Sequence, residues 1–230
     1  MSNNVREVRA RVLPFLVFML FVGVEELLRF SVGKDFSVPD QLLLFLYPVK
    51  AGIVAILLLM LWPNYREFRF GDILQWQSTL LSTLIGLFIF WLWIQMTAEF
   101  ATVGESAGLN VEAYQEGFVR NTMIGVRLCG AVLVVPLMEE LFWRSFLIRY
   151  LVKKEFMQVS IGMFTWFSFL ATAVLFGLEH NLYLAGICAG ILFNLVLYRT
   201  RSIFQCVLSH AVANLALGIY VLNSGNWHFW

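Results

Sequence analysis

The chain has 230 residues and a formal net charge of +1, and 60% of its residues are hydrophobic while only 13% are charged. Soluble domains carry about 25% charged residues, so this composition excludes an ordinary soluble domain and indicates a polytopic membrane protein. The near-neutral charge, without a basic run, excludes the surface that a nucleic-acid-binding protein needs.

Seven segments are apolar enough to cross a bilayer, because a spanning helix needs about 20 mostly apolar residues. To within a few residues they are 12–30, 41–62, 77–98, 124–150, 164–182, 184–199 and 203–222. The fourth is long enough to begin as an interfacial helix after Glu116, so we expect seven or eight transmembrane helices. Without a repeat or a linker, residues 1–230 are predicted to form a single all-α membrane domain.

The placement of lysine and arginine predicts the orientation, since cytoplasmic loops carry the excess. With the amino terminus in the cytoplasm, eleven of the sixteen basic residues fall on the cytoplasmic side. They are Arg6, Arg9, Arg11, Arg66, Arg69, Arg144, Arg149, Lys153, Lys154, Arg199 and Arg201. Seven crossings then leave the carboxyl terminus on the outer side.

The first segment ends in an acidic pair, Glu25 and Glu26. No histidine is expected at the same depth, so we interpret this pair as structural or interfacial, with Lys50 of the second segment as its partner. The fourth segment contains a second acidic pair, Glu139 and Glu140, followed by Arg144. Ionisable groups are costly at membrane depth and mark functional sites there.

On a helix Glu140 and Arg144 are four residues apart and share a face, whereas Glu139 lies about 100° round from Glu140. We therefore expect the arginine to hold Glu140 while Glu139 faces a cavity. The structural alternative is an ion-pair network that only ties helices together.

The last three segments carry two of the three histidines. The fifth places Phe176 and His180 on one face, with Glu179 beside the histidine. The sixth contains Gly186 and Gly190 at a spacing that lets helix backbones approach closely. The seventh places His210 and Asn214 on one face. His180 alone could equally be a hydrogen-bonded packing residue, and packing is also the alternative for His210 with Asn214.

The depths of these groups agree. Counted from the cytoplasmic ends at about 1.5 Å per residue, Glu139 lies ~16 Å deep, His210 ~11 Å and Asn214 ~17 Å. His180 lies ~22 Å deep if its helix begins near Thr165, after a connecting loop. We therefore predict that they converge in an intramembrane catalytic cavity.

These residue types suit peptide hydrolysis, in which a base takes a proton from water and donors hold the oxyanion. Glu139 could be the base, with His180 sharing water activation, and His210 and Asn214 could be the oxyanion donors. A transporter with a proton relay is an alternative, although transporters are usually built from repeats. A non-catalytic membrane scaffold is another, and it predicts that alanine at both histidines changes nothing.

At these residues the chain resembles the CAAX-protease and bacteriocin-processing (CPBP, Abi) family of intramembrane proteases. The family's EExxxR, FxxxH and HxxxN motifs stand here as Glu139-Glu140-Leu-Phe-Trp-Arg144, Phe176-Gly-Leu-Glu-His180 and His210-Ala-Val-Ala-Asn214. The match covers residues 120–222, which would form the catalytic core. The flanking residues further resemble the CAAX prenyl protease-related branch that occurs with bacterial exosortases, which implies a bacterial inner membrane.

The resemblance implies an endopeptidase whose cavity opens to the cytoplasm and whose substrate is a membrane-associated protein or peptide. It assigns water activation to Glu139 and His180, oxyanion stabilisation to His210 and Asn214, and support to the remaining motif residues, Glu140 and Arg144. Family members are commonly called metalloproteases, and Glu139, His180 and His210 could supply three zinc ligands. The chain has no HExxH motif, so we favour a glutamate-activated water without a cofactor. The sequence does not predict an oligomeric state.

Overall fold

The structure is a computed structural model that describes residues 3–32, 40–104, 111, 114 and 116–230. Within these residues every regular element is helical, which confirms the all-α prediction. The α-helices are α1 (Asn3–Val32), α2 (Asp40–Leu61), α3 (Trp76–Gln95), α4 (Phe118–Cys129), α5 (Val135–Glu140), α6 (Ile148–Tyr150), α7 (Trp166–Leu178), α8 (Tyr183–Thr200) and α9 (Ile203–Ser224).

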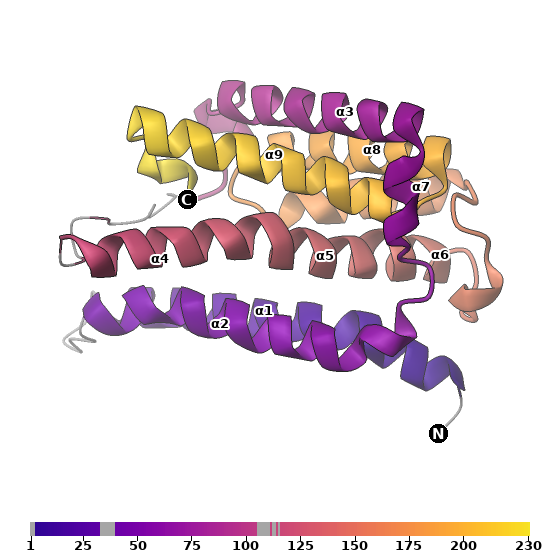
Figure 1. The fold of residues 1–230 in the computed structure, drawn as a ribbon, viewed down its shortest axis with the longest axis horizontal. Helices are drawn as coiled ribbons and strands as arrows, with labels where there is room; N and C mark the ends of the chain where they lie inside the picture. The colour runs from indigo at the N-terminus through magenta and orange to yellow at the C-terminus, as the bar shows by residue number, and fades with distance from the viewer. Residues whose placement is uncertain (1–2, 33–39, 105–110, 112–113, 115) are drawn as a thin grey trace.

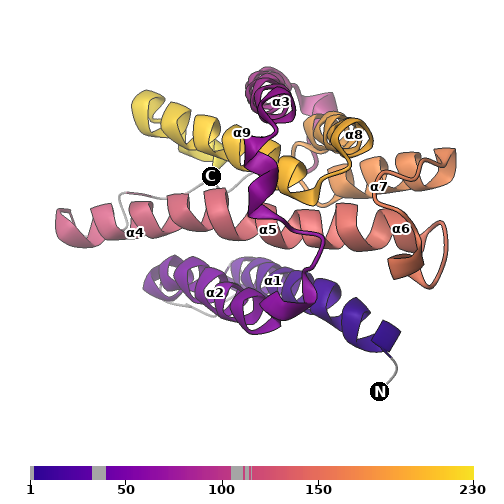
Figure 2. The ribbon, with the colours of Figure 1, turned by 45° about the vertical axis from the view of Figure 1, so that its right-hand side comes forward.

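The helices α4, α5 and α6 follow one another in a single rod, residues 118–150, which we call the central helix. The central helix lies between two layers (Figure 1). The pair α1 and α2 covers one side, and α3, α8 and α9 cover the other. Figure 2 shows α7 beside α8 on that second side. The middle of the central helix is therefore enclosed by protein rather than by lipid.

Two π-helical segments, Gly130–Val134 and Leu141–Leu147, flank α5 within the central helix. In the first, the N–H of Val135 donates to the Gly130 carbonyl, five residues back. The next donor in this register would be Pro136, which has no N–H. The wider turn therefore leaves the Ala131 carbonyl without a bond inside the helix.

Five helical stretches of the described residues are long and apolar enough to cross a membrane, so the chain is an integral membrane protein. They are Phe45–Asn64, Trp76–Gln95, Phe118–Tyr150, Tyr183–Thr200 and Ile203–Ser224. The other two predicted segments correspond to α1, which is long but charged, and to α7, which has only 13 residues. The count of seven crossings, and the single domain over residues 1–230, stay predictions.

Side-chain caps fix where the later helices begin. The Thr165 hydroxyl accepts from the Ser168 N–H at 3.2 Å, so α7 starts at Trp166 after a connecting loop, as predicted. The Ser202 hydroxyl accepts from the Gln205 N–H at 3.3 Å at the start of α9. Such caps satisfy backbone donors that have no partner inside the helix.

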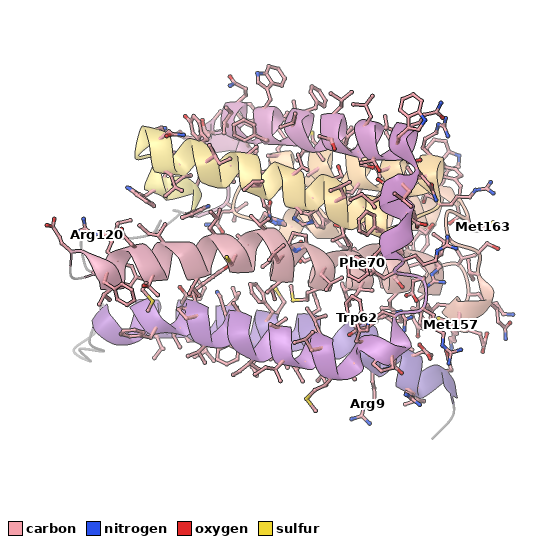
Figure 3. The ribbon with its side chains drawn as sticks, viewed as in Figure 1. Arg9, Trp62, Phe70, Arg120, Met157 and Met163 are labelled. Atoms are coloured by element: carbon pink, nitrogen blue, oxygen red, sulfur yellow. The ribbon has the colours of Figure 1, made fainter. Side chains whose placement is uncertain are left out.

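A buried network of charged residues lies at one end of the bundle. Arg11 donates to both carboxylate oxygens of Glu67 at 2.8 Å. The Ser145 hydroxyl also donates to Glu67, and Arg149 lies 3.8 Å from it. Because the predicted cytoplasmic arginines gather here, we call this the basic end. Figure 3 places Met157 and Met163 at this end and Arg120 at the opposite end.

The predicted partnership of Glu25 with Lys50 is confirmed. The Lys50 ammonium donates to a Glu25 carboxylate oxygen at 3.1 Å, joining α1 to α2. Neither residue lines the cavity described below. Glu25 therefore belongs to the packing of the first two helices.

Glycines let α7 and α8 touch backbone to backbone. A Cβ at Gly186 would lie 2.8 Å from the Gly177 Cα, and one at Gly190 would lie 2.9 Å from the Ala173 carbonyl oxygen. Real Cβ atoms do not approach backbone atoms this closely. The close packing predicted from the Gly186 and Gly190 spacing is confirmed.

Gly186→Val should push α7 away from α8 and lower the free energy of unfolding by about 1–3 kcal/mol, the usual cost of overpacking. Gly52→Val in α2 is the matched control, because a Cβ there meets nothing within 4 Å. Thermal denaturation in detergent compares the two variants. Equal shifts would contradict the close contact.

Candidate active site

A fully buried ion pair stands at the centre of the bundle. The Arg144 guanidinium donates to Glu140 Oε1 at 3.1 Å, as predicted from their spacing, and neither side chain is exposed. The guanidinium carbon lies 4.5 Å from the Phe176 ring centre and 5.1 Å from that of Phe193. Arg144 also donates to the Gly190 carbonyl at 3.3 Å. It therefore joins the central helix to α7 and α8.

His210 is held by the same carboxylate. Its Nδ1 lies 2.9 Å from Glu140 Oε1, and its Nε2 lies 4.0 Å from Glu139 Oε2. A carboxylate accepts, so Nδ1 carries the proton, and Nε2 of the neutral ring is then an acceptor. His210 can donate to an oxyanion through Nε2 only when both ring nitrogens are protonated. This bond to Glu140 was not predicted from the sequence.

Glu139 faces a cavity of about 180 Å³. The side chains of Glu139, His180, His210 and Asn214 line it, and the rest of its lining is apolar. Glu139 is 6% exposed, and its Oε2 has no hydrogen-bond partner among the described residues. The structure thus brings together four predicted site residues from α5, from α9 and from the turn after α7. Their catalytic roles stay predictions.

His180 lies just beyond the end of α7, in the turn before α8. Its Nδ1 is 2.8 Å from the Phe176 carbonyl oxygen. Since a carbonyl can only accept, Nδ1 is the donor and Nε2 of the neutral ring is free to accept. The Trp93 ring meets the imidazole edge-on, with 5.3 Å between ring centres. Aromatic walls therefore fix the orientation of this histidine.

Asn214 hydrogen-bonds to a backbone carbonyl in the irregular part of the central helix. Its Nδ2 donates to the Ala131 carbonyl at 2.7 Å, which is the carbonyl that Pro136 leaves without a partner. A side-chain amide has two N–H groups. One is thus committed to the central helix, and the other is available to a substrate oxygen in the cavity.

Glu179 is the residue that sequence reasoning missed. It follows the last residue of α7, and Trp143 Nε1 donates to its Oε1 at 3.1 Å. Carboxylate oxygens of Glu139 and Glu179 and a ring nitrogen of His180 all lie within 4.8 Å of one another. The only signal in the sequence was that Glu179 directly precedes His180.

Two carboxylates and an imidazole are a donor set that fits a divalent metal, since catalytic zinc sites use three such ligands and a water. Among the described residues, the grouping that could hold an ion is Glu139, Glu179 and His180. It contains two of the three ligands predicted from the sequence, with Glu179 in the place of His210. The metal role of the predicted trio stays a prediction.

A second cavity, of about 530 Å³, adjoins the first. The two share the side chains of Trp93, His180, Phe229 and Trp230 in their walls. The second cavity lies beyond the end of α3, away from the basic end. With the predicted orientation this is the outer side. The family resemblance instead implies a cavity that opens to the cytoplasm. The predicted orientation and the resemblance therefore disagree about the side on which these two cavities open.

Comparison with known proteins gives a match to a protein family. Residues 121–216 match the family described as Type II CAAX prenyl endopeptidase Rce1-like. The matched range contains all six predicted site residues, and it confirms the resemblance to CAAX proteases. No curated protein and no solved structure matches the chain. The narrower resemblance to the exosortase-associated branch stays a prediction.

Proposed function

From the premise that residues 121–216 are similar to the Type II CAAX prenyl endopeptidases, we propose that this protein is a membrane-embedded endopeptidase. It hydrolyses a peptide bond of a membrane-associated protein or peptide. The observation that carries the proposal is that Glu139, His180, His210 and Asn214 line one cavity whose remaining lining is apolar.

In the proposed reaction Glu139 is the general base. Its buried oxygen, free of other hydrogen bonds among the described residues, takes a proton from a water molecule while the water oxygen attacks the peptide carbonyl. His180 Nε2 accepts the second hydrogen bond of that water. The proton then passes from Glu139 to the leaving amine nitrogen as the carbon–nitrogen bond breaks.

The carbonyl oxygen gains negative charge during the attack, so donors must face it. The second N–H of Asn214 and the Nε2–H of protonated His210 are the proposed donors. Glu140 supports His210 by accepting from Nδ1, and Arg144 holds Glu140 in place. Arg144 and Glu140 thus act through their neighbours and do not touch the substrate.

This reaction needs no cofactor, which is the mechanism that the sequence favours. The alternative is a zinc ion held by cavity ligands, where it would polarise the carbonyl and the water. We place the protein in a bacterial inner membrane because the flanking residues resemble the exosortase-associated branch. We place its amino terminus in the cytoplasm because the basic residues gather at one end. The second cavity would then admit substrate from the outer side.

Comparative mass spectrometry of membrane proteins tests the function. Cells that carry the wild-type chain are compared with cells that carry Glu139→Gln. We expect at least one peptide terminus that is present only with the wild type. If the two sets of termini are identical while both proteins accumulate to the same level, the endopeptidase proposal is wrong.

A further inference from the structure

Residues 225–230 turn back after α9 and lie beside the first cavity, and we call them the fold-back segment. Helix α9 ends at Ser224, and Gly225 follows it in the left-handed conformation, with a φ of +72°. A left-handed residue at this position ends a helix and redirects the chain. Figures 1 and 2 both place the end of the chain between α9 and the central helix. The fold-back segment therefore returns toward the inside of the bundle.

Phe229 and Trp230 lie where the two cavities meet. Both side chains are half-buried, and both line the first cavity, which Glu139 faces, as well as the second cavity. The Phe229 ring centre lies 6.0 Å from that of Tyr220 in α9. A Cβ at Gly218 of α9 would lie 3.1 Å from Trp230 Cζ2. The missing side chain at Gly218 thus leaves the space in which the indole ring packs.

The first cavity is too small for a peptide substrate as it stands. Pockets that enclose a drug-sized ligand have volumes of about 300–1,000 Å³, whereas the first cavity has about 180 Å³. The second cavity, on the other side of Phe229 and Trp230, has about 530 Å³. A peptide bond can therefore reach Glu139 from the second cavity only if part of the shared wall moves.

Among the described parts of this wall, the fold-back segment is the one with local backbone bonding. The loop after α3 is tied to the turn between α7 and α8, because the Val103 N–H donates to the Asn181 carbonyl at 2.8 Å. The Tyr183 hydroxyl donates to the Phe100 carbonyl of the same loop at 2.7 Å. The backbone hydrogen bonds of the fold-back segment run instead within residues 221–230. Such a segment can open locally without breaking the bonds of other elements.

We propose that the fold-back segment is a gate, in which Phe229 and Trp230 close the first cavity and move away about Gly225 when a peptide substrate enters. The inference rests on the proposed function for what enters the cavity. In the closed state the two aromatic side chains separate Glu139 from the second cavity. Lids of this kind keep bulk water from an active site and control access to it.

The first measurement reports access to the cavity and needs no cleavage. In a protein with Cys129, Cys188 and Cys206 replaced by alanine, Ala213→Cys places a single thiol in the wall of the first cavity. The rate of its reaction with N-ethylmaleimide in detergent measures how often the cavity is open. Glu155→Cys, in an exposed loop, gives the rate of an open thiol. We expect the cavity thiol to react more slowly.

Gly225→Val should raise the labelling rate of the cavity thiol by about 5- to 30-fold, because a side chain strains the left-handed backbone of the closed state. Gly117→Val is the matched control, since Gly117 also has a positive φ and a Cβ at either glycine meets nothing within 4 Å. Trp230→Ala should also raise the rate, with Trp76→Ala at an exposed position as its control. In the active enzyme, kcat/KM for peptide cleavage should rise in parallel.

Labelling rates of Gly225→Val and Trp230→Ala equal to those of their controls would overturn the inference. So would a cavity thiol that reacts as fast as the thiol of Glu155→Cys. Faster labelling without a rise in kcat/KM would also overturn it, because substrate would then enter by another route. If the wild type and Glu139→Gln cleave equally, the proposed function itself fails, whereas the labelling rates still decide whether the segment closes the cavity.

Discussion

Glu139→Gln should lower kcat/KM for peptide cleavage by about 10²- to 10⁴-fold, the range that a positioned general base contributes. Glutamine keeps the size of the side chain but cannot take a proton from water. The folded state should be unaffected, because Glu139 Oε2 makes no hydrogen bond among the described residues that the substitution could break. Steady-state kinetics and the thermal transition in detergent measure both quantities.

Glu155→Gln serves as the control for the same chemical change at an exposed site. A Glu139→Gln protein that keeps more than about a tenth of the wild-type kcat/KM would rule out this residue as the base. A protein that loses activity together with its thermal transition would instead indicate a structural role.

Arg144→Met should destabilise the protein by about 3–5 kcal/mol, because it leaves the Glu140 carboxylate buried without its partner. The loss should be much larger than that of Arg69→Met. Arg69 pairs with Asp72 at 3.7 Å, but its side chain is 67% exposed, and exposed pairs contribute only about 0–1 kcal/mol. Chemical denaturation in detergent compares the two variants.

The double variant Arg144→Met, Glu140→Gln separates charge from packing. Removing both charges should recover part of the lost stability, because no isolated carboxylate then remains in the core. If the double variant is no more stable than Arg144→Met alone, the isolated carboxylate is not the cause of the lost stability, and the lost packing of the guanidinium between Phe176 and Phe193 accounts for it. Equal stability of Arg144→Met and Arg69→Met would contradict the buried pair altogether.

The sequence was sufficient for features that follow from spacing along a helix. Hydropathy located the helical segments, and the four-residue separation of Glu140 and Arg144 predicted their ion pair. Counting depth from the basic end predicted that Glu139, His180 and His210 would meet in one cavity. These inferences need only the regular rise and rotation of a helix.

The sequence was insufficient where contacts depend on irregular backbone or on side-chain direction. The bond from Asn214 to the Ala131 carbonyl exists because Pro136 follows a π-helical segment, and hydropathy does not reveal such a segment. The fifth segment was predicted to run to residue 182, but α7 ends at Leu178. Glu179 therefore lies in a turn that aims it toward Glu139, and helical spacing could not show this.

The brevity of α7 has a consequence for the surrounding lipid. Thirteen residues reach about 20 Å, which is roughly 10 Å less than the thickness of the hydrocarbon layer. If α7 crosses the membrane, as predicted from its sequence, the bilayer beside it must thin, or headgroups must sink toward the turn. The length of the acyl chains in the host membrane would then set how far water must reach into the bilayer to meet His180, and lipid composition would affect access to this residue.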